Sequence, residues 1–165
     1  MKQQALQIQF REFGTLDDLS EIQVTLVNEA IGAAEMAYAP YSGSYVGAAV
    51  RLGNGKIITG NNQENAAYPS GLCAERVAIF YAGSQYPDVP VTSIAIVAMH
   101  DGALQEEPVT PCGACRQVLC EKESQGETPL ELILYGKKKI LVIQRAADLL
   151  PLPFTLKTGY ISNFG

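Results

Sequence analysis

The sequence predicts a layered α/β domain in which helices cover a mixed central sheet. Short apolar segments rich in β-branched residues recur at positions 46–52, 91–99 and 140–144, and they have the length of strands. Segments with helix signals separate them, which gives the order helix, hairpin, helix, strand, helix, strands. That alternation is typical of the α/β class.

The first helix is predicted from its start signal and its apolar face. Ser20 is followed three residues later by Gln23, which is the spacing of a capping box. The helix should end before Pro40, because the residue preceding a proline avoids the helical region. The residues expected to share its apolar face are Leu26, Ala30, Ala34 and Ala37.

The remaining elements follow from apolar runs and turn residues. Asn54-Gly55 predicts a tight turn between two strands of a hairpin. Leu6, Ile8 and Phe10 alternate with polar residues and predict a short N-terminal strand within residues 5–13. The expected helices lie at about 73–82 and from 112–113 onward, the other strands at 46–52, 56–60, 91–99, 131–135 and 140–144, and a helical turn at 146–150.

Composition indicates one folded domain, residues 1–165, that binds a small molecule. Hydrophobic residues make up 47% of the chain and charged residues 18%, which argues against disorder. The net charge is -5, and the one basic run is Lys137-Lys138-Lys139, so a nucleic-acid partner is not expected. The N-terminus lacks a signal peptide's apolar core, and no stretch could span a membrane. We therefore expect a cytoplasmic protein with no membrane partner, whose four cysteines stay reduced.

Three cysteines are the candidate metal ligands. Cys112 and Cys115 form a C-x-x-C pair at the start of one predicted helix, and Cys73 starts the helix before it. A C-x-x-C pair alone could be redox-active, structural or a coincidence. Helix N-termini favour thiolate over thiol, however, and zinc binds thiolate, so both positions suit the same cation.

The number of ligands predicts a catalytic zinc rather than a structural one. Three protein ligands leave the fourth tetrahedral position for water, and we expect one Zn²⁺ per chain. Cys120 lies five residues after Cys115 on the same predicted helix and is interpreted as a buried apolar side chain. His100, at the end of a strand, is interpreted as a polar surface group.

Glu75 and Arg76 follow Cys73 in the first turn of the same predicted helix. A glutamate there can reach over the helix end toward the metal, so we predict Glu75 as the catalytic general acid and base; the alternative is a glutamate that only suits the helix dipole. Three thiolates give the zinc site a formal charge of -1. Arg76 is expected to hydrogen-bond to their sulfurs and offset this charge, the alternative being a solvated surface arginine.

These residues resemble the three-cysteine branch of the cytidine deaminase family. The motifs that carry the resemblance are Cys73-Ala74-Glu75-Arg76, the segment Pro111 to Gln117, Ala39-Pro40-Tyr41-Ser42, the segments 46–49 and 60–69, and Leu149-Leu150-Pro151. The likeness covers about residues 20–154 and leaves residues 1–19 as an N-terminal extension. It implies a three-layer fold with a mixed five-stranded sheet and helices on both faces, to which the N-terminal strand is an addition. It also implies a homotetramer with shared active sites and a place in pyrimidine salvage.

The resemblance also implies substrate-binding residues. Asn62 and Glu64 would hold the ribose hydroxyls, which favours a free nucleoside, because a carboxylate repels a phosphate at that position. The backbone N–H of Ala74 would hold the C2 carbonyl of the base. The full implied substrate-binding set is Asn62, Glu64, Asn65, Tyr68, Ala74 and Phe154, the last borrowed by a neighbouring subunit.

One departure from the family pattern concerns the wall of the base pocket. Ser44 occupies the position where the family has an aromatic residue that packs on the base. Tyr45 is the next residue, but in an extended segment it points to the opposite side.

The predicted reaction is hydrolytic deamination of cytidine, and of deoxycytidine, to the uridine form plus ammonia. Water would attack C4 of the base while Glu75 protonates N3 and then the departing amine. The alternatives are deamination of another aminopyrimidine such as a blasticidin-like compound, a nucleic-acid editor, and a non-enzymatic zinc module closed by Cys120.

Overall fold

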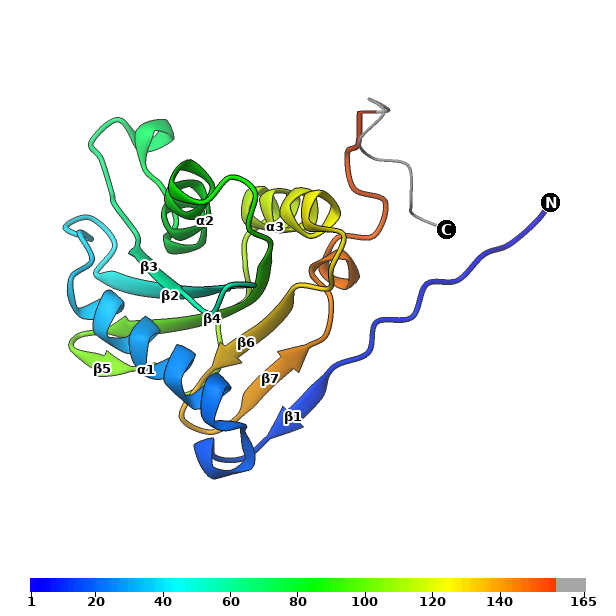
Figure 1. The fold of residues 1–165 in the computed structure, drawn as a ribbon. Helices are drawn as coiled ribbons and strands as arrows, with labels where there is room; N and C mark the ends of the chain where they lie inside the picture. Colours follow the sequence, from blue (N-terminus) through cyan, green and yellow to red (C-terminus); the bar gives the residue numbers. More distant parts are fainter. Residues whose placement is uncertain (157–165) are drawn as a thin grey trace.

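The computed structural model describes residues 1–156 and shows a mixed sheet between two layers of helices (Figure 1). The sheet has seven strands, with the order β1-β7-β6-β4-β2-β3 and β5 paired to β4. Strands β4 and β6 are parallel, and the other pairs are antiparallel. The strands are β1 (Arg11–Phe13), β2 (Ser44–Leu52), β3 (Ile57–Asn61), β4 (Val91–His100), β5 (Ala103–Leu104), β6 (Glu131–Tyr135) and β7 (Ile140–Ile143).

The predicted layers are confirmed. Helix α1 (Glu21–Glu35) covers one face of the sheet, while α2 (Ala74–Gln85) and α3 (Gly113–Gly126) cover the other (Figure 1). Two apolar clusters fill the spaces between the layers. The five strands β2, β3, β4, β6 and β7 form the expected sheet, to which β1 and the two-residue β5 are added.

Helix α1 begins as its capping box predicts. The Ser20 hydroxyl accepts a hydrogen bond from the Gln23 N–H at 3.4 Å, and the Gln23 side chain accepts one from the Ser20 N–H at 3.0 Å. Leu26, Ala30 and Ala34 are buried, as predicted, but the helix ends at Glu35. Ala37, which we expected on the same face, lies beyond the helix.

Two glycines bring the helices close to the sheet. A Cβ on Gly47 of β2 would collide with the Ala30 carbonyl oxygen of α1, and a Cβ on Gly60 of β3 would lie 2.5 Å from the Ala78 nitrogen of α2. Helix α2, which carries Cys73 at its N-cap, is therefore packed directly on β3. This close contact fixes the position of the candidate metal ligands relative to the sheet.

The N-terminal strand is shorter than predicted and lies later in the chain. Residues 1–10 belong to no helix or strand, so the strand expected from Leu6, Ile8 and Phe10 is wrong in its position. The strand that forms is β1, which pairs antiparallel with β7 at the edge of the sheet. Its partner ends at Ile143, opposite the residue preceding Arg11, and strand pairing stops there.

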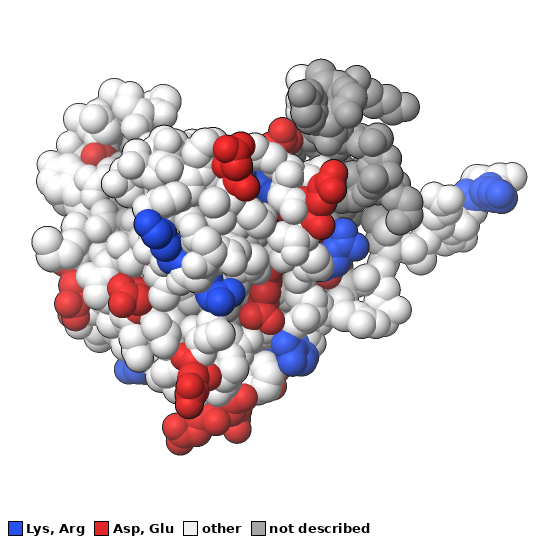
Figure 2. Space-filling view, in the orientation of Figure 1, with Lys and Arg blue, Asp and Glu red and all other residues white. Residues whose placement is uncertain are grey.

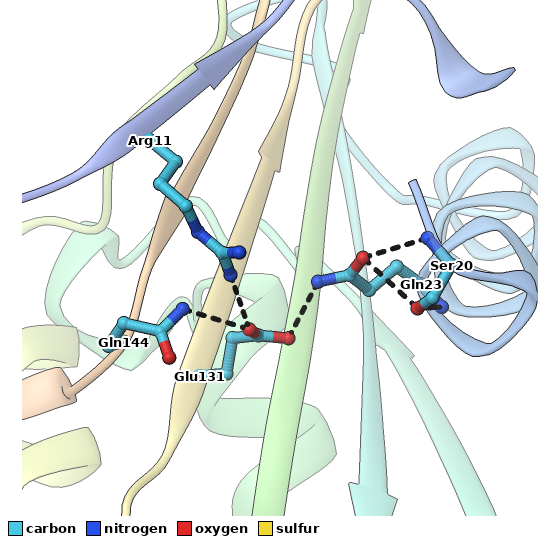
Figure 3. A network of polar contacts seen from close by, with 5 residues as sticks. All are labelled: Arg11, Ser20, Gln23, Glu131 and Gln144. Atoms are coloured by element: carbon cyan, nitrogen blue, oxygen red, sulfur yellow. Dashed lines mark hydrogen bonds and ion pairs between the residues drawn. The ribbon is translucent and has the colours of Figure 1, made fainter. Parts of the chain in front are cut away.

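A polar network ties β1 to the body of the molecule (Figure 3). The Glu131 carboxylate on β6 contacts Arg11 at 3.5 Å and accepts hydrogen bonds from Gln23 at 2.9 Å and Gln144 at 3.3 Å. Because Gln23 also belongs to the capping box with Ser20, one carboxylate connects the sheet, the start of α1 and the N-terminal extension.

The C-terminal part of the described chain is held against α3. The helical turn expected at 146–150 is present as a short helix, Ala146–Leu149. The buried Glu123 carboxylate of α3 accepts hydrogen bonds from the Ala146 N–H at 2.6 Å and the Leu130 N–H at 3.1 Å. None of the helices within residues 1–156 combines the length and apolar character that a membrane crossing requires.

Candidate functional site

Three sulfur atoms converge where α2 and α3 begin. Cys73 is the N-cap of α2, Cys112 is the N-cap of α3, and Cys115 lies in the first turn of α3. The Cys112 sulfur lies 3.9 Å from that of Cys73 and 3.5 Å from that of Cys115, and all three sulfurs lie within 4.8 Å of one another. The structure therefore brings the three predicted ligands together.

The electrostatics at this cluster favour thiolate. A hydrogen bond from the Cys115 thiol, together with those from Arg76 and Cys112, lowers the pKa of Cys73 to about 5, although burial opposes the shift. The same contact with Cys73 raises the pKa of Cys115, which is also buried. Cys73 is therefore the sulfur prepared to bind as thiolate, and a bound divalent cation would favour the thiolate form of its ligands.

Glu75 lies beside the sulfurs in a place shielded from water. It is 5% exposed and lies in the first turn of α2. Burial raises the pKa of its carboxyl group, and the negative charge of Cys73 raises it further. A carboxyl whose pKa is raised toward neutrality is suited to both accept and donate a proton.

Arg76 contacts the cluster as predicted. Its Nη2 donates to the Cys73 sulfur at 3.6 Å, and this bond raises the pKa of the guanidinium. The Arg76 Nε is buried and has no hydrogen-bond partner among the described residues. The guanidinium therefore places a positive charge beside the Cys73 sulfur, where it opposes the negative charge of the thiolates.

The two other candidate ligands point elsewhere. The Cys120 thiol is buried and donates to the Ala146 carbonyl at 3.5 Å, and burial raises its pKa to about 11. His100 is exposed at the end of β4, where its Nδ1 lies 2.9 Å from the Gly43 carbonyl oxygen. Neither residue belongs to the group of three sulfurs.

The position of His100 gives a first testable prediction. We expect His100→Ala to leave the metal content of the protein unchanged, because the imidazole contacts the Gly43 loop and not the sulfurs. Metal analysis of the purified variant beside the unmodified protein checks this. A fall in bound zinc would place His100 among the ligands and contradict the assignment.

An open pocket of about 480 Å³ lies next to the cluster. Its lining comes from Cys73 and Arg76, from the loop after β3, and from Tyr41 and Ser42 in the segment before β2. Four of the predicted substrate-binding residues line it together, namely Asn62, Glu64, Asn65 and Tyr68. The volume is within the range of small-molecule sites.

Within this pocket, Glu64 is anchored by the segment before β2. Its carboxylate accepts hydrogen bonds from the Ser42 hydroxyl at 2.5 Å, the Tyr41 N–H at 2.9 Å and the Ser42 N–H at 3.3 Å. The bond from the Ser42 hydroxyl, the largest of these effects, holds the pKa of Glu64 below its usual value. Glu64 therefore presents a fixed, ionised carboxylate.

The two asparagines already have partners in the backbone. The Asn62 side chain accepts from the Val46 N–H at 2.7 Å and donates to the Ser44 carbonyl at 2.9 Å, so it supports the first residues of β2. Asn65 accepts from the Ala67 N–H at 2.8 Å. Each amide nitrogen carries two hydrogens, and each amide oxygen two lone pairs, so both side chains retain capacity for a ligand.

Sequence reasoning missed two pocket residues. Ser42 orients Glu64, and the Tyr41 ring meets the Tyr68 ring edge-on, with centroids 6.0 Å apart. Tyr41 and Ser42 stand in a segment that carries the resemblance, but no local pattern shows that it folds against the loop after β3. Contacts between segments more than 20 residues apart leave no periodic signal.

The last two predicted substrate-binding residues are Ala74, which is buried at the start of α2, and Phe154, which is exposed. Ala74 is buried and is the first residue of α2, where helix N–H groups have no acceptor within the helix. Phe154 is 70% exposed and does not line the pocket of its own chain. Gln117 of α3 holds it by both backbone groups, donating to its carbonyl at 2.8 Å and accepting from its N–H at 3.1 Å.

The register of β2 decides which way Ser44 and Tyr45 face. Val46 and Ala48 pack with α2, whereas Ala49 packs with α1, and side chains alternate along a strand. Ser44 therefore faces the α2 side, and Tyr45 faces the α1 side. Tyr45 cannot take the place of an aromatic residue at Ser44.

Comparison with known proteins agrees with this site. The family model described as "Cytidine and deoxycytidylate deaminase zinc-binding region" matches residues 1–111. A cytidine deaminase of Mycobacterium tuberculosis is 35% identical over 136 residues, which cover 79% of this chain and 88% of that protein. A cytidine deaminase of Halalkalibacterium halodurans is 49% identical over 96 residues, 58% of this chain and 68% of that protein.

Solved structures give the same result. The crystal structure of cytidine deaminase from Burkholderia pseudomallei superimposes with a TM-score of 0.68 at 41% identity, covering 79% of this chain and 97% of that one. That of Mycobacterium tuberculosis superimposes with a TM-score of 0.64 at 34% identity, covering 80% and 96%. The predicted fold class and the predicted resemblance are confirmed, and the chain belongs to the cytidine and deoxycytidylate deaminase family.

Proposed function

We propose that this protein is a zinc-dependent hydrolase that deaminates cytidine, and deoxycytidine, to the corresponding uridine nucleoside and ammonia. The observation that carries the proposal is the group of three converging sulfurs with a buried glutamate, Glu75, in the first turn of the helix that Cys73 begins. The names of the relatives supply the reaction, since each is a cytidine deaminase.

The three sulfurs fit one tetrahedral zinc ion per chain. Zinc–sulfur bonds of about 2.3 Å at tetrahedral angles place two sulfurs about 3.8 Å apart. The two measured separations, 3.9 and 3.5 Å, agree with that value before any adjustment. Cys73, Cys112 and Cys115 would hold the ion, and bound zinc supplies a water-derived nucleophile at neutral pH.

Glu75 performs the proton transfers. Its carboxylate accepts one proton from the attacking water and delivers it to N3 of the base. It then accepts the second proton from the new hydroxyl on C4 and delivers it to the amine, which leaves as ammonia as the C4 carbonyl forms. Burial keeps the carboxyl out of bulk water, so protons remain between it and the base. Arg76 stabilises the thiolate of Cys73 through its hydrogen bond.

The nucleoside occupies the pocket beside Cys73. Asn62 and Glu64 hold the ribose hydroxyls, Asn65 and Tyr68 line the same space, and the Ala74 N–H binds the C2 carbonyl of the base. The Glu64 carboxylate is suited to this role, because its hydrogen bonds from Ser42 and Tyr41 fix its position.

We further propose a homotetramer with shared active sites, working in the cytoplasm in pyrimidine salvage. Phe154 supports sharing, because Gln117 holds it in an exposed position outside its own pocket, from which it can enter that of a neighbour. The four free cysteines are consistent with a reducing compartment. Acidic and basic side chains are interspersed on the face in Figure 2, which favours a small substrate over nucleic acid.

An ultraviolet assay of the purified protein tests the function. Cytidine and deoxycytidine should lose the cytosine absorbance, whereas cytosine, which lacks the ribose, should be converted much more slowly. Retained zinc with no conversion of either nucleoside would indicate a non-enzymatic zinc module. Conversion of a blasticidin-like compound in preference to cytidine would show that another aminopyrimidine is the substrate.

Glu64 predicts discrimination against phosphate on the ribose. We expect kcat/KM for cytidine to exceed that for 3′-CMP by about tenfold or more, because the phosphate would lie against an ionised carboxylate. Glu64→Gln should lower kcat/KM for cytidine and reduce the ratio between the two substrates. Efficient deamination of a single-stranded oligonucleotide by the unmodified protein would contradict the nucleoside assignment.

A further inference from the structure

The N-terminal arm, residues 1–10, exposes large apolar side chains. The arm continues from β1 and projects away from the body of the molecule (Figure 1). Leu6, Ile8 and Phe10 are 71%, 45% and 57% exposed. Three large apolar side chains at every second position make one face of an extended segment, and such a face usually marks an interaction site.

The backbone beside the arm is also available for pairing. Among residues 1–156, strand β1 is the last strand of the sheet on its side, with β7 as its one neighbour in the sheet order. Arg11 pairs with Val142, and β7 ends one residue later, so the arm runs past the end of its own sheet. An unpaired edge of this kind accepts a strand from another chain.

The sequence of the arm matches itself when two copies run antiparallel. Leu6 and Phe10 are symmetric about Ile8, so a two-fold axis at Ile8 places each Leu6 opposite the other copy's Phe10 and Ile8 opposite Ile8. Gln7 and Gln9 then face each other on the reverse side of the ribbon, where their amides can hydrogen-bond. Aromatic and β-branched cross-strand pairs of this kind stabilise antiparallel strands.

The charges agree with the same register. Lys2 is the one charged side chain of the arm, and the first acidic residue of the chain is Glu12, in β1. In Figure 2 the projecting arm ends in basic atoms, well apart from the acidic side chains of the body. With the axis at Ile8, Glu12 lies opposite Gln4 of the other copy and diagonal to its Lys2, so opposite charges are neighbours.

We propose that the arms of two copies of this chain pair antiparallel about Ile8 and join the two sheets edge to edge through β1. A second copy fits better than an unrelated partner, because a two-fold interface requires a self-complementary surface and the arm has one in both apolar pattern and charge. The network of Glu131 with Arg11 and Gln23 anchors the base of the arm to the sheet (Figure 3). The arm is separate from the pocket, so the proposal does not depend on the catalytic function.

Cysteine cross-linking tests the register. In full-length protein, Ile8→Cys should give a disulfide between two copies under mild oxidation, since the introduced thiols face each other. Gln3→Cys is the matched control, because position 3 lies nearer the free end of the arm but opposite position 13. Its two thiols would be about 34 Å apart at about 3.4 Å per residue.

The expected result is at least about tenfold more cross-linked product for Ile8→Cys, with the disulfide between the introduced thiols identified by peptide mass. Equal cross-linking of the two variants would show that the arms contact each other at random, without a fixed register. No cross-linking at position 8 would show that the arms do not pair there. Either outcome overturns the proposal.

A charge exchange gives an independent test. Ile8→Glu and Ile8→Lys should each weaken the association of the arms, because like charges would face each other across the axis. An equal mixture of the two variants should restore it, as measured by the mass of the assembly in sedimentation. Failure of the mixture to recover the mass lost by both single variants would exclude self-pairing at Ile8.

Discussion

Replacement of Glu75 by glutamine should lower the turnover of cytidine by at least about 10²–10⁴-fold, the usual contribution of one general acid–base group. The amide has nearly the same shape as the carboxylate, but it can neither accept the proton of the attacking water nor deliver one to N3 and the amine. Because one carboxylate serves several transfers, the loss should lie at the upper end of this range or above it. Single-turnover and steady-state assays at neutral pH measure it.

The variant should keep its metal and its fold, which separates loss of proton transfer from loss of the site. Glu75 is not one of the three sulfur ligands, so zinc content should stay the same. Glu75→Asp is the matched comparison: it retains an ionisable group but moves it back by one methylene, and it should retain more activity than Glu75→Gln. Near-normal turnover in the glutamine variant, with zinc in place, would exclude Glu75 as the proton carrier.

Much of the fold was predictable because local signals and long-range pairing agree. The capping box at Ser20 and Gln23 gives the start of α1, and the Asn54-Gly55 turn gives the β2–β3 hairpin. The N-terminal strand shows where this agreement ends. The alternating pattern begins at Leu6, but a strand forms only from Arg11 onward, where β7 offers hydrogen-bond partners. The alternating pattern makes a segment able to form a strand, but the length of the strand depends on the partner strand, here β7.

The candidate metal centre was predictable for a different reason. Its ligands lie at the starts of two helices, and Cys112 and Cys115 are three residues apart, so the sequence motif also indicates their local geometry. The pocket depends on contacts between distant segments. Neither the hydrogen bond from Ser42 to Glu64 nor the support of β2 by Asn62 has a local signature. In α3, Glu123 has the sequence context of a solvated helix residue, yet it is buried and caps two backbone segments.

Phe154 lies exposed, outside the pocket of its own chain. Two hydrogen bonds from its backbone to the Gln117 side chain fix its position, and its ring is exposed to solvent. The Ser44 position on the α2 side lacks an aromatic side chain, and Tyr45 faces the other way. A borrowed aromatic ring is therefore the main apolar wall that we propose for the base.

Substitution of Cys115 by serine should remove zinc from the protein, and with it the deaminase activity. Zinc binding free energies of about 10–16 kcal/mol for four ligands correspond to about 2.5–4 kcal/mol per ligand, or about 10²–10³-fold in affinity. A serine hydroxyl stays protonated and does not replace a thiolate. Metal analysis after gel filtration, together with turnover of cytidine, gives the two readings.

Cys120→Ser is the matched control on the same helix. Both thiols are buried and five residues apart, but that of Cys120 donates to the Ala146 carbonyl, and burial raises its pKa to about 11, so it remains a thiol. A serine hydroxyl can make the same hydrogen bond, and zinc and turnover should both persist. If Cys120→Ser lost zinc as Cys115→Ser does, the site would have four protein ligands. A tetrahedral ion would then have no position left for water, and the chain would be a structural zinc domain rather than an enzyme.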